Sequence, residues 1–125
     1  MKLPEGHQQI MPYLIIGGVD AFIQFAKQVF GAKETFRRMR DEQVVMHAEV
    51  QIGASTVMMA DSTNDWPTHP ASLFIYVEDA DATYQKALEA GAVSVMEMST
   101  EDYGRTGGFR DPQGNVWWIT TVLEN

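Results

Sequence analysis

His47 and Glu49 are the residues of this sequence best suited to acid–base chemistry. They stand two positions apart in the run 44–52, whose β-branched and apolar composition predicts a strand. Side chains two apart on a strand share a face, so the imidazole and the carboxylate would lie side by side. A carboxylate favours the protonated form of a neighbouring imidazole, and such a pair could act as acid and base. A structural hydrogen bond or a solvated sheet face is the alternative interpretation.

Tyr103 and Arg105 form a second candidate group, just before the glycine pair Gly107-Gly108. We expect them in a glycine-rich loop at the rim of a sheet, because glycine lets the chain bend sharply. Arginine offers a planar fork of donors and tyrosine a ring with a polar tip, so the two could orient an anionic or planar ligand. The alternative is a solvent-facing loop in which Arg105 pairs with a neighbouring acidic residue.

The composition narrows the class of protein. A length of 125 residues predicts a single domain, 1–125, and a net charge of −8 argues against a nucleic-acid or anionic-membrane partner. The absence of cysteine excludes thiol chemistry and disulfides. No apolar run is long enough to cross a membrane, and the first residues contain no apolar segment typical of a secretory signal. We therefore expect a cytoplasmic protein.

The elements that position these residues follow one pattern twice. A first βαβββ unit spans approximately 8–61, with a helix over 19–30 and strands over 10–16, 33–40, 44–52 and 56–60. A polar, proline-containing linker covers 62–70. A second unit spans approximately 71–123, with a helix after Asp79 and strands over 72–77, 93–98, 109–111 and 116–123.

Matched glycines indicate that the second unit is a duplicate of the first. The pair Gly31-Ala32 recurs as Gly91-Ala92, and Gly53 recurs as Gly114, each at an offset of about 60 residues. A single unit would leave one face of its sheet bare, so two units must pair to form a core. The expected architecture is α+β, with tandem βαβββ units forming a curved mixed sheet around a cleft.

Several motifs give this pattern a family resemblance. The helices FIQFAKQVFGA and VEDADATYQKALEAGA, together with the terminal FRDPQGNVWWI, resemble the vicinal oxygen chelate superfamily of glyoxalases, bleomycin-resistance proteins and extradiol dioxygenases. HAEVQIGASTVMMAD and YGRTGGFRDPQGNVWWI are similar in particular to its PhnB-like branch. The resemblance runs from about Met11 to Val122, and it implies the duplicated fold and a homodimer.

The resemblance also locates the metal site of the superfamily. Its metal-using members carry one ligand near the start of the first strand and one in the last strand of each unit. Those four positions fall here on Met11, Met58, Ser72 and Trp118. None of these side chains suits a divalent cation that prefers carboxylate or imidazole. We therefore expect no metal and no cofactor, which argues against glyoxalase, dioxygenase and metal-dependent transferase activity.

The same positions predict a binding surface instead. Trp118 takes the place of a carboxylate, so its ring should project into the cleft. Strand alternation adds apolar and small residues to this surface, namely Met11, Tyr13, Met58, Ser72, Phe74 and Tyr76. The alternative is that these side chains only fill the cleft as core. Trp66, in the linker, is either a lid over the cleft or a dimer contact.

Three functions remain in competition at this point. The first is a metal-free binding protein for a small apolar or aromatic ligand, similar to the bleomycin-resistance members and dimeric like them. The second is a metal-independent isomerase or lyase with His47 and Glu49 as acid and base, in which Tyr103 and Arg105 place the substrate. The third is a non-catalytic interaction module with a filled cleft.

Overall fold

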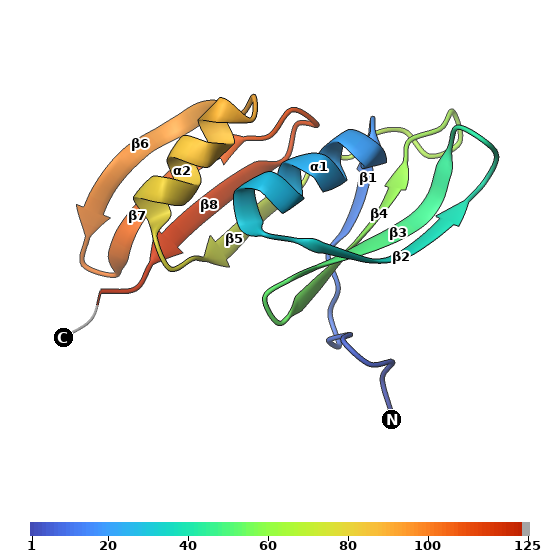
Figure 1. Ribbon diagram of the computed structural model, residues 1–125, viewed down its shortest axis with the longest axis horizontal. Coiled ribbons are helices and arrows are strands. Elements are labelled where there is room, and N and C mark those ends of the chain that lie inside the picture. Colours follow the sequence, from blue (N-terminus) through green and yellow to red (C-terminus); the bar gives the residue numbers. More distant parts are fainter. Residues whose placement is uncertain (124–125) are drawn as a thin grey trace. The chain divides into compact units, whose positions relative to one another are not determined.

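The computed structural model describes residues 1–123, and the chain divides into two compact units, Met1–His69 and the part from Pro70 onward. Each unit has the element order β-α-β-β-β and one four-stranded sheet with one helix against it (Figure 1). The structure therefore confirms the α+β class and the two tandem βαβββ units. Within residues 1–123, no helix has the length and apolar character needed to span a membrane.

The first unit contains a mixed sheet of strand order β1-β4-β3-β2. Its parallel pair is β1 with β4, and the other neighbours are antiparallel. Helix α1 lies across one face of the sheet (Figure 1). The elements are β1 (Tyr13–Ile16), α1 (Val19–Phe30), β2 (Lys33–Met39), β3 (Val45–Ile52) and β4 (Ser55–Asp61).

The core of the first unit lies between α1 and this sheet. Apolar residues recur at three- and four-residue spacing in α1, which gives the helix one buried stripe: Val19, Phe22, Ile23, Phe25, Ala26 and Val29. The facing strands contribute the buried side chains Leu14, Ile16, Ala48, Val50 and Met59. The helix ends at Gly31, which adopts a left-handed conformation with φ 67°. The apolar face of β3 thus lies under the helix.

The second unit repeats this arrangement with strand order β5-β8-β7-β6. Helix α2 covers one face, where Ala80, Ala87, Phe109, Trp117 and Ile119 are buried. Asp79 caps α2 by accepting a hydrogen bond from Ala82 N. The elements are β5 (Ser72–Tyr76), α2 (Ala80–Glu89), β6 (Val93–Glu101), β7 (Gly104–Arg110) and β8 (Val116–Thr121).

Two helix caps support the internal duplication. Asp61 ends β4, and its Oδ1 accepts a hydrogen bond from Val19 N, the first residue of α1, at 2.8 Å. Thr121 ends β8, and its Oγ1 accepts from Ala80 N, the first residue of α2, at 2.7 Å. In both units, therefore, the end of the last strand holds the start of the helix.

The turn before β8 is built on one buried carboxylate. Residues Asp111-Pro112-Gln113-Gly114 form a tight turn, as an Asp-Pro-x-Gly sequence favours, with Gly114 N donating to Asp111 O at 2.9 Å. The Asp111 side chain, 3% exposed, also accepts from Gln113 N, Asn115 N, Asn115 Nδ2 and Trp117 Nε1. Because Trp117 is fixed in this way, the next residue, Trp118, must point to the face away from α2.

Two predicted strands differ clearly from the structure. The first strand starts at Tyr13 rather than at residue 10, and the predicted short strand 109–111 is part of the longer strand β7. Arg105 and the glycine pair, predicted to lie in a loop, therefore lie in a strand. The glycines are needed there because neighbours approach closely. A Cβ on Gly108 would lie 2.7 Å from the Trp118 ring, and one on Gly107 would overlap the Met98 sulfur.

The segment predicted as a linker, 62–70, is held by the first unit through His69. His69 N donates to Ile15 O at 2.9 Å in an isolated antiparallel bridge, and Ser62 N donates to Ile16 O at 2.8 Å. The Trp66 side chain within this segment is 65% exposed. Its expected role as a lid or as a dimer contact stays a prediction.

Candidate functional site

Four polar side chains form one hydrogen-bonded chain on the face of the first sheet that α1 leaves uncovered. His47 Nε2 lies 2.8 Å from Glu49 Oε2, as the two-residue spacing predicted, and Tyr13 Oη lies 3.0 Å from His47 Nδ1. His7 Nε2 lies 2.7 Å from the other carboxylate oxygen, Glu49 Oε1. We call Tyr13, His47, Glu49 and His7 the proton chain. Its order is Tyr13–His47–Glu49–His7.

The carboxylate in the middle fixes where the protons lie. Burial raises the pKa of Glu49, but the hydrogen bonds from His47 and His7 and their charges outweigh it, so the pKa lies below its ordinary value of 4.5. An ionised carboxylate only accepts hydrogen bonds. Each imidazole must therefore carry a proton on Nε2, and a neutral His47 presents the lone pair of Nδ1 to the Tyr13 hydroxyl.

The proton chain runs from a buried end to an exposed end. Glu49 is 9% exposed, whereas Tyr13 is 48% exposed. Burial, and secondly the charge of Glu49, raises the pKa of Tyr13 above its ordinary value of 10.0, so the phenol stays protonated at neutral pH. The rings of Tyr13 and Phe36 lie 5.3 Å and 5.7 Å from the His47 ring between centroids, and they flank the imidazole with apolar surface.

The segment Gly6–Gln8 positions His7 in the proton chain through hydrogen bonds with Thr56. The Gln8 amide donates to Thr56 O at 2.9 Å and accepts from Thr56 N at 3.2 Å, while Thr56 Oγ1 donates to Gly6 O at 2.5 Å. From the sequence alone His7 had no partner, because it lies outside any predicted element. Its contact with Glu49 joins residues 42 positions apart, and no local pattern encodes such a contact.

A different surface lies on the second sheet, on the face that α2 leaves uncovered. Phe74 and Tyr76 alternate along β5 and are 53% and 67% exposed, with ring centroids 5.0 Å apart. Trp118 lies beside Phe74 on the neighbouring strand β8. We call Phe74, Tyr76 and Trp118 the aromatic face. The predicted ligand-binding residue Ser72 joins it by accepting a hydrogen bond from Trp118 Nε1 at 3.0 Å.

The Trp118 ring is held flat against the strand beside it. Gly108 is its cross-strand partner on β7, and the ring occupies the space where a Cβ of residue 108 would be. The hydrogen bond to Ser72 fixes the other side of the indole. A ring held on two sides loses little conformational entropy when a ligand stacks on it.

Arg105 does not join the aromatic face. It pairs with Thr121 across β7 and β8, and strand alternation places Thr121 and Trp118 on opposite faces of the sheet. Its guanidinium binds both carboxylate oxygens of Asp81 at 3.0 Å and donates to Thr100 at 3.2 Å. Tyr103 lies in the β6–β7 turn and is 54% exposed.

The positions expected for metal ligands carry other contacts here. Met58 lies between Tyr13 and Glu49 in the register of β1, β4 and β3, and Ser72 binds the Trp118 indole. Thioether, hydroxyl and indole groups do not suit a hard or borderline divalent ion. Across residues 1–123, no three or more His, Asp or Glu side chains are grouped so as to hold a metal ion.

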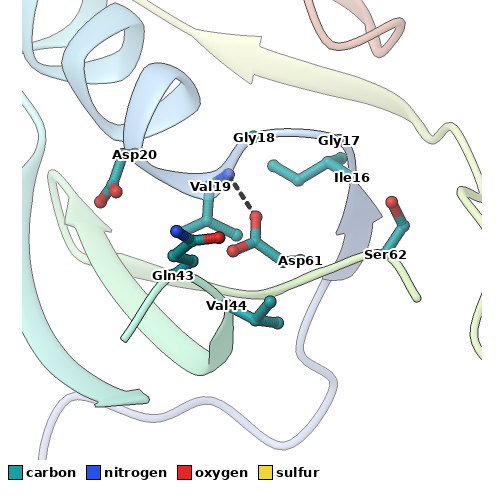
Figure 2. Close-up of a pocket in the computed structure, with 9 residues that line it drawn as sticks. All are labelled: Ile16, Gly17, Gly18, Val19, Asp20, Gln43, Val44, Asp61 and Ser62. Carbon is teal, nitrogen blue, oxygen red and sulfur yellow. Dashed lines mark hydrogen bonds between the residues drawn. The ribbon is translucent and has the colours of Figure 1, made fainter. Parts of the chain in front are cut away.

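A shallow pocket of about 350 Å³ lies at the start of α1, and Figure 2 shows its lining. The Asp61 carboxylate points into this region and accepts from Val19 N at 2.8 Å and from Val45 N at 2.7 Å. The N-terminus of the helix is therefore already occupied by a carboxylate of the chain itself. An external anion would be repelled from this pocket rather than attracted to it.

Comparisons with known proteins agree with this architecture. The Glyoxalase/Bleomycin resistance protein/Dioxygenase superfamily model matches residues 7–119. The uncharacterized protein Mb0911c of Mycobacterium bovis is 30% identical over 120 residues, covering 86% of this chain and 79% of its own length.

Solved structures share the fold. TioX from Micromonospora sp. ML1 superposes with a TM-score of 0.73 at 21% identity, over 94% of this chain and 98% of its own. A Bacillus cereus PhnB protein, described as a putative 3-demethylubiquinone-9 3-methyltransferase, gives 0.70 at 18% identity, over 92% and 100%. With the family match covering almost the whole described chain, this protein belongs to the Glyoxalase/Bleomycin resistance protein/Dioxygenase superfamily.

Proposed function

We propose that this chain is a metal-free binding protein for a small molecule with an apolar or aromatic body. The observation that carries the proposal is the aromatic face, where two rings more than half exposed stand beside a tryptophan that is fixed on both sides. Small-molecule sites are lined mainly by apolar and aromatic side chains with a few polar groups, and the aromatic face together with Ser72 offers that combination. Met58 on the first sheet, and Tyr103 and Arg105 on the second unit, stay proposed ligand contacts outside this face.

The experiment is a screen of small aromatic compounds for thermal stabilisation, followed by the variant Trp118→Ala. We expect at least one compound to stabilise the wild-type protein and the variant to lose that binding while it stays folded. Tyr84→Phe is the control, because Tyr84 lies on α2 and donates to Ser94 rather than joining the aromatic face. Binding that survives in Trp118→Ala would contradict the proposal, and stabilisation by no compound would favour a non-catalytic interaction module.

A second candidate function is a metal-independent isomerase or lyase that acts on a carbonyl compound. The proton chain favours it, because a buried carboxylate orients an imidazole whose other nitrogen meets an exposed hydroxyl. His47 and Glu49 would serve as the acid–base pair. The test is hydrogen–deuterium exchange at the carbon next to a carbonyl, followed by NMR in D₂O without added metal. We expect exchange with the wild-type protein and a steep loss in His47→Ala.

We further propose that the protein works as a cytoplasmic homodimer without a bound metal or nucleic acid. The dimer follows from the family resemblance, and the absence of a nucleic-acid partner from the net charge of −8. Light scattering on the purified protein should give twice the mass of the 14.0 kDa chain. Elemental analysis should find no stoichiometric divalent ion, and one ion per chain would overturn the metal-free proposal.

A further inference from the structure

We propose that Tyr13 is the residue that exchanges a proton with an oxygen atom of the substrate, and that His7 is a positioning residue that holds Glu49 in place for this exchange. The inference rests on the second candidate function, the isomerase or lyase. It adds a proton donor, a positioning residue and a class of substrate to the His47–Glu49 pair.

The exposure of the residues in the proton chain indicates that Tyr13 is the one that exchanges a proton with the substrate. Tyr13 is about half exposed as a whole residue, whereas the side chains of His47 and Glu49 are 22% and 11% exposed. Nδ1 of His47 faces the Tyr13 hydroxyl at 3.0 Å, and Nε2 faces Glu49. Both ring nitrogens are thus engaged within the protein. A ligand on this face therefore meets the phenol hydroxyl rather than the imidazole.

The proton transfer is balanced within these groups and the ligand. When His47 is an imidazolium, its Nδ1–H donates to the Tyr13 oxygen, and the Tyr13 O–H is free to donate outward. The Tyr13 proton passes to a negatively charged substrate oxygen, and the Nδ1 proton passes to the Tyr13 oxygen. The substrate anion becomes neutral, the imidazolium becomes neutral imidazole, and Glu49 stays ionised throughout. The reverse sequence removes a proton from a substrate hydroxyl.

The surroundings indicate the class of substrate. An oxygen that gains and loses a proton in this way is that of an enolate or enol, formed from a carbonyl compound with a hydrogen on the adjacent carbon. A solvent water takes that hydrogen as a proton while Tyr13 protonates the carbonyl oxygen, so the carbonyl compound becomes its enol, the imidazolium becomes imidazole and the water becomes hydronium. The rings of Phe36 and Tyr13 flank the His47 imidazole, and Met58 lies between Tyr13 and Glu49. These apolar groups fit a small carbonyl compound with an apolar substituent.

His7 acts through Glu49 rather than on the ligand. It binds Glu49 Oε1 at 2.7 Å while His47 binds Oε2, so the two imidazoles hold the carboxylate from both sides. The docking of Gln8 and Gly6 on Thr56 fixes His7 in turn. Removal of His7 would leave one oxygen of a nearly buried carboxylate without this donor and free the carboxylate to rotate away from His47.

The test measures hydrogen–deuterium exchange in D₂O on pyruvate, phenylpyruvate and hydroxyacetone. We expect Tyr13→Phe and His47→Gln each to slow the exchange by about 100-fold, which is the usual contribution of one general acid or base. The double variant should be no slower than either single variant, because the two residues act as one unit. Tyr84→Phe is the matched control, since Tyr84 donates to Ser94 on the second unit, and its rate should be that of the wild type.

The outcomes separate the inference from the function on which it rests. If the exchange is slow in His47→Gln but has the wild-type rate in Tyr13→Phe, the proposed role of Tyr13 is refuted and the acid–base pair stands. Losses that multiply in the double variant would also refute the relay. If none of the three compounds exchanges with the wild-type protein, the isomerase or lyase proposal fails, and the inference fails with it.

Two further measurements test the parts of the proton chain separately. His7→Ala should slow the exchange about tenfold, the effect of losing one hydrogen bond to a charged group, and His7→Gln should restore it, because the glutamine amide can still donate to Glu49. Equal rates in the two variants would exclude a positioning role. Nitrogen-15 NMR of the imidazoles should show Nε2–H on both His7 and His47 at neutral pH. A neutral His47 with its proton on Nδ1 would overturn the relay without any substrate.

Discussion

The substitution Asp111→Ala is expected to destabilise the second unit severely. The Asp111 carboxylate is 3% exposed and accepts hydrogen bonds from Gln113 N, Asn115 N, Asn115 Nδ2 and Trp117 Nε1. Asn115 and Trp117 are themselves 0% and 2% exposed, so water cannot replace the lost acceptor there without local opening. Hydrogen bonds to a charged group contribute about 1.5–3 kcal/mol each, and they are not additive.

Loss of the bonds to the two buried residues gives an expected decrease of about 3–5 kcal/mol in the free energy of unfolding. That is a large share of the roughly 5–15 kcal/mol that stabilises an ordinary domain. The assay is urea denaturation followed by tryptophan fluorescence and by far-ultraviolet circular dichroism. Asp65→Ala is the control, because Asp65 is exposed, and it should stay close to the wild type.

Asp111→Asn separates the charge from the shape of the side chain. The amide keeps one acceptor oxygen but replaces the other with a donor that faces the Trp117 indole N–H, so we expect an intermediate loss of about 2 kcal/mol. The reasoning would be refuted if Asp111→Ala lay within about 1 kcal/mol of the wild type, the scale of an ordinary surface substitution. It would also be refuted if Asp111→Asn were as stable as the wild type.

Three further predictions concern the two candidate surfaces. Gly108→Ala places a Cβ 2.7 Å from the Trp118 ring and should lower the free energy of unfolding, measured by urea denaturation, by about 1–3 kcal/mol. Gly17→Ala is the control and should lower it much less, because a Cβ there has no neighbour closer than 3.9 Å. Equal decreases in the two variants would contradict this account. Because the pKa of Glu49 is lowered in the folded state, its carboxylate adds stability that is fully present above about pH 4.5 and is lost as the pH falls through the folded-state pKa. In Glu49→Gln the free energy of unfolding, measured by urea denaturation at several pH values, should therefore fall less steeply below about pH 4.5 than in the wild type. Spectrophotometric titration of the phenols should lose a step above pH 10.0 in Tyr13→Phe, because the Tyr13 pKa is raised above that value, and no loss above pH 10.0 would show that Tyr13 ionises normally.

The sequence was sufficient to predict the fold because its signals are local and occur twice. The three- and four-residue spacing of apolar side chains in α1, the glycine at 31 and the Asp-Pro-x-Gly turn before β8 each determine a nearby stretch of backbone. The shared face of His47 and Glu49 also follows from alternation within one strand. These predictions needed no knowledge of which distant segments meet.

The features that the sequence did not predict correctly depend on contacts between distant segments. Gly107 and Gly108 lie in a strand because Met98 and Trp118 occupy the space beside them, and that neighbourhood forms only when β6, β7 and β8 pair. His7 gains its role from a carboxylate 42 residues away. Arg105 is paired with Asp81 across 24 residues, whereas the alternative interpretation of the sequence paired it with an acidic residue only a few positions away. Contacts of this kind depend on the tertiary fold.

The two helix caps at the ends of β4 and β8 have a consequence for how the chain folds. Each cap joins the last strand of a unit to the helix of the same unit, across 42 residues in the first unit and 41 in the second. In each repeat, therefore, a hydrogen bond within the repeat joins its last strand to its helix. During synthesis the first repeat is complete once Asp61 has emerged, before any of the second repeat is available as a folding partner. The duplication thus copied a unit that carries its own closing bond, with a carboxylate in one copy and a hydroxyl in the other.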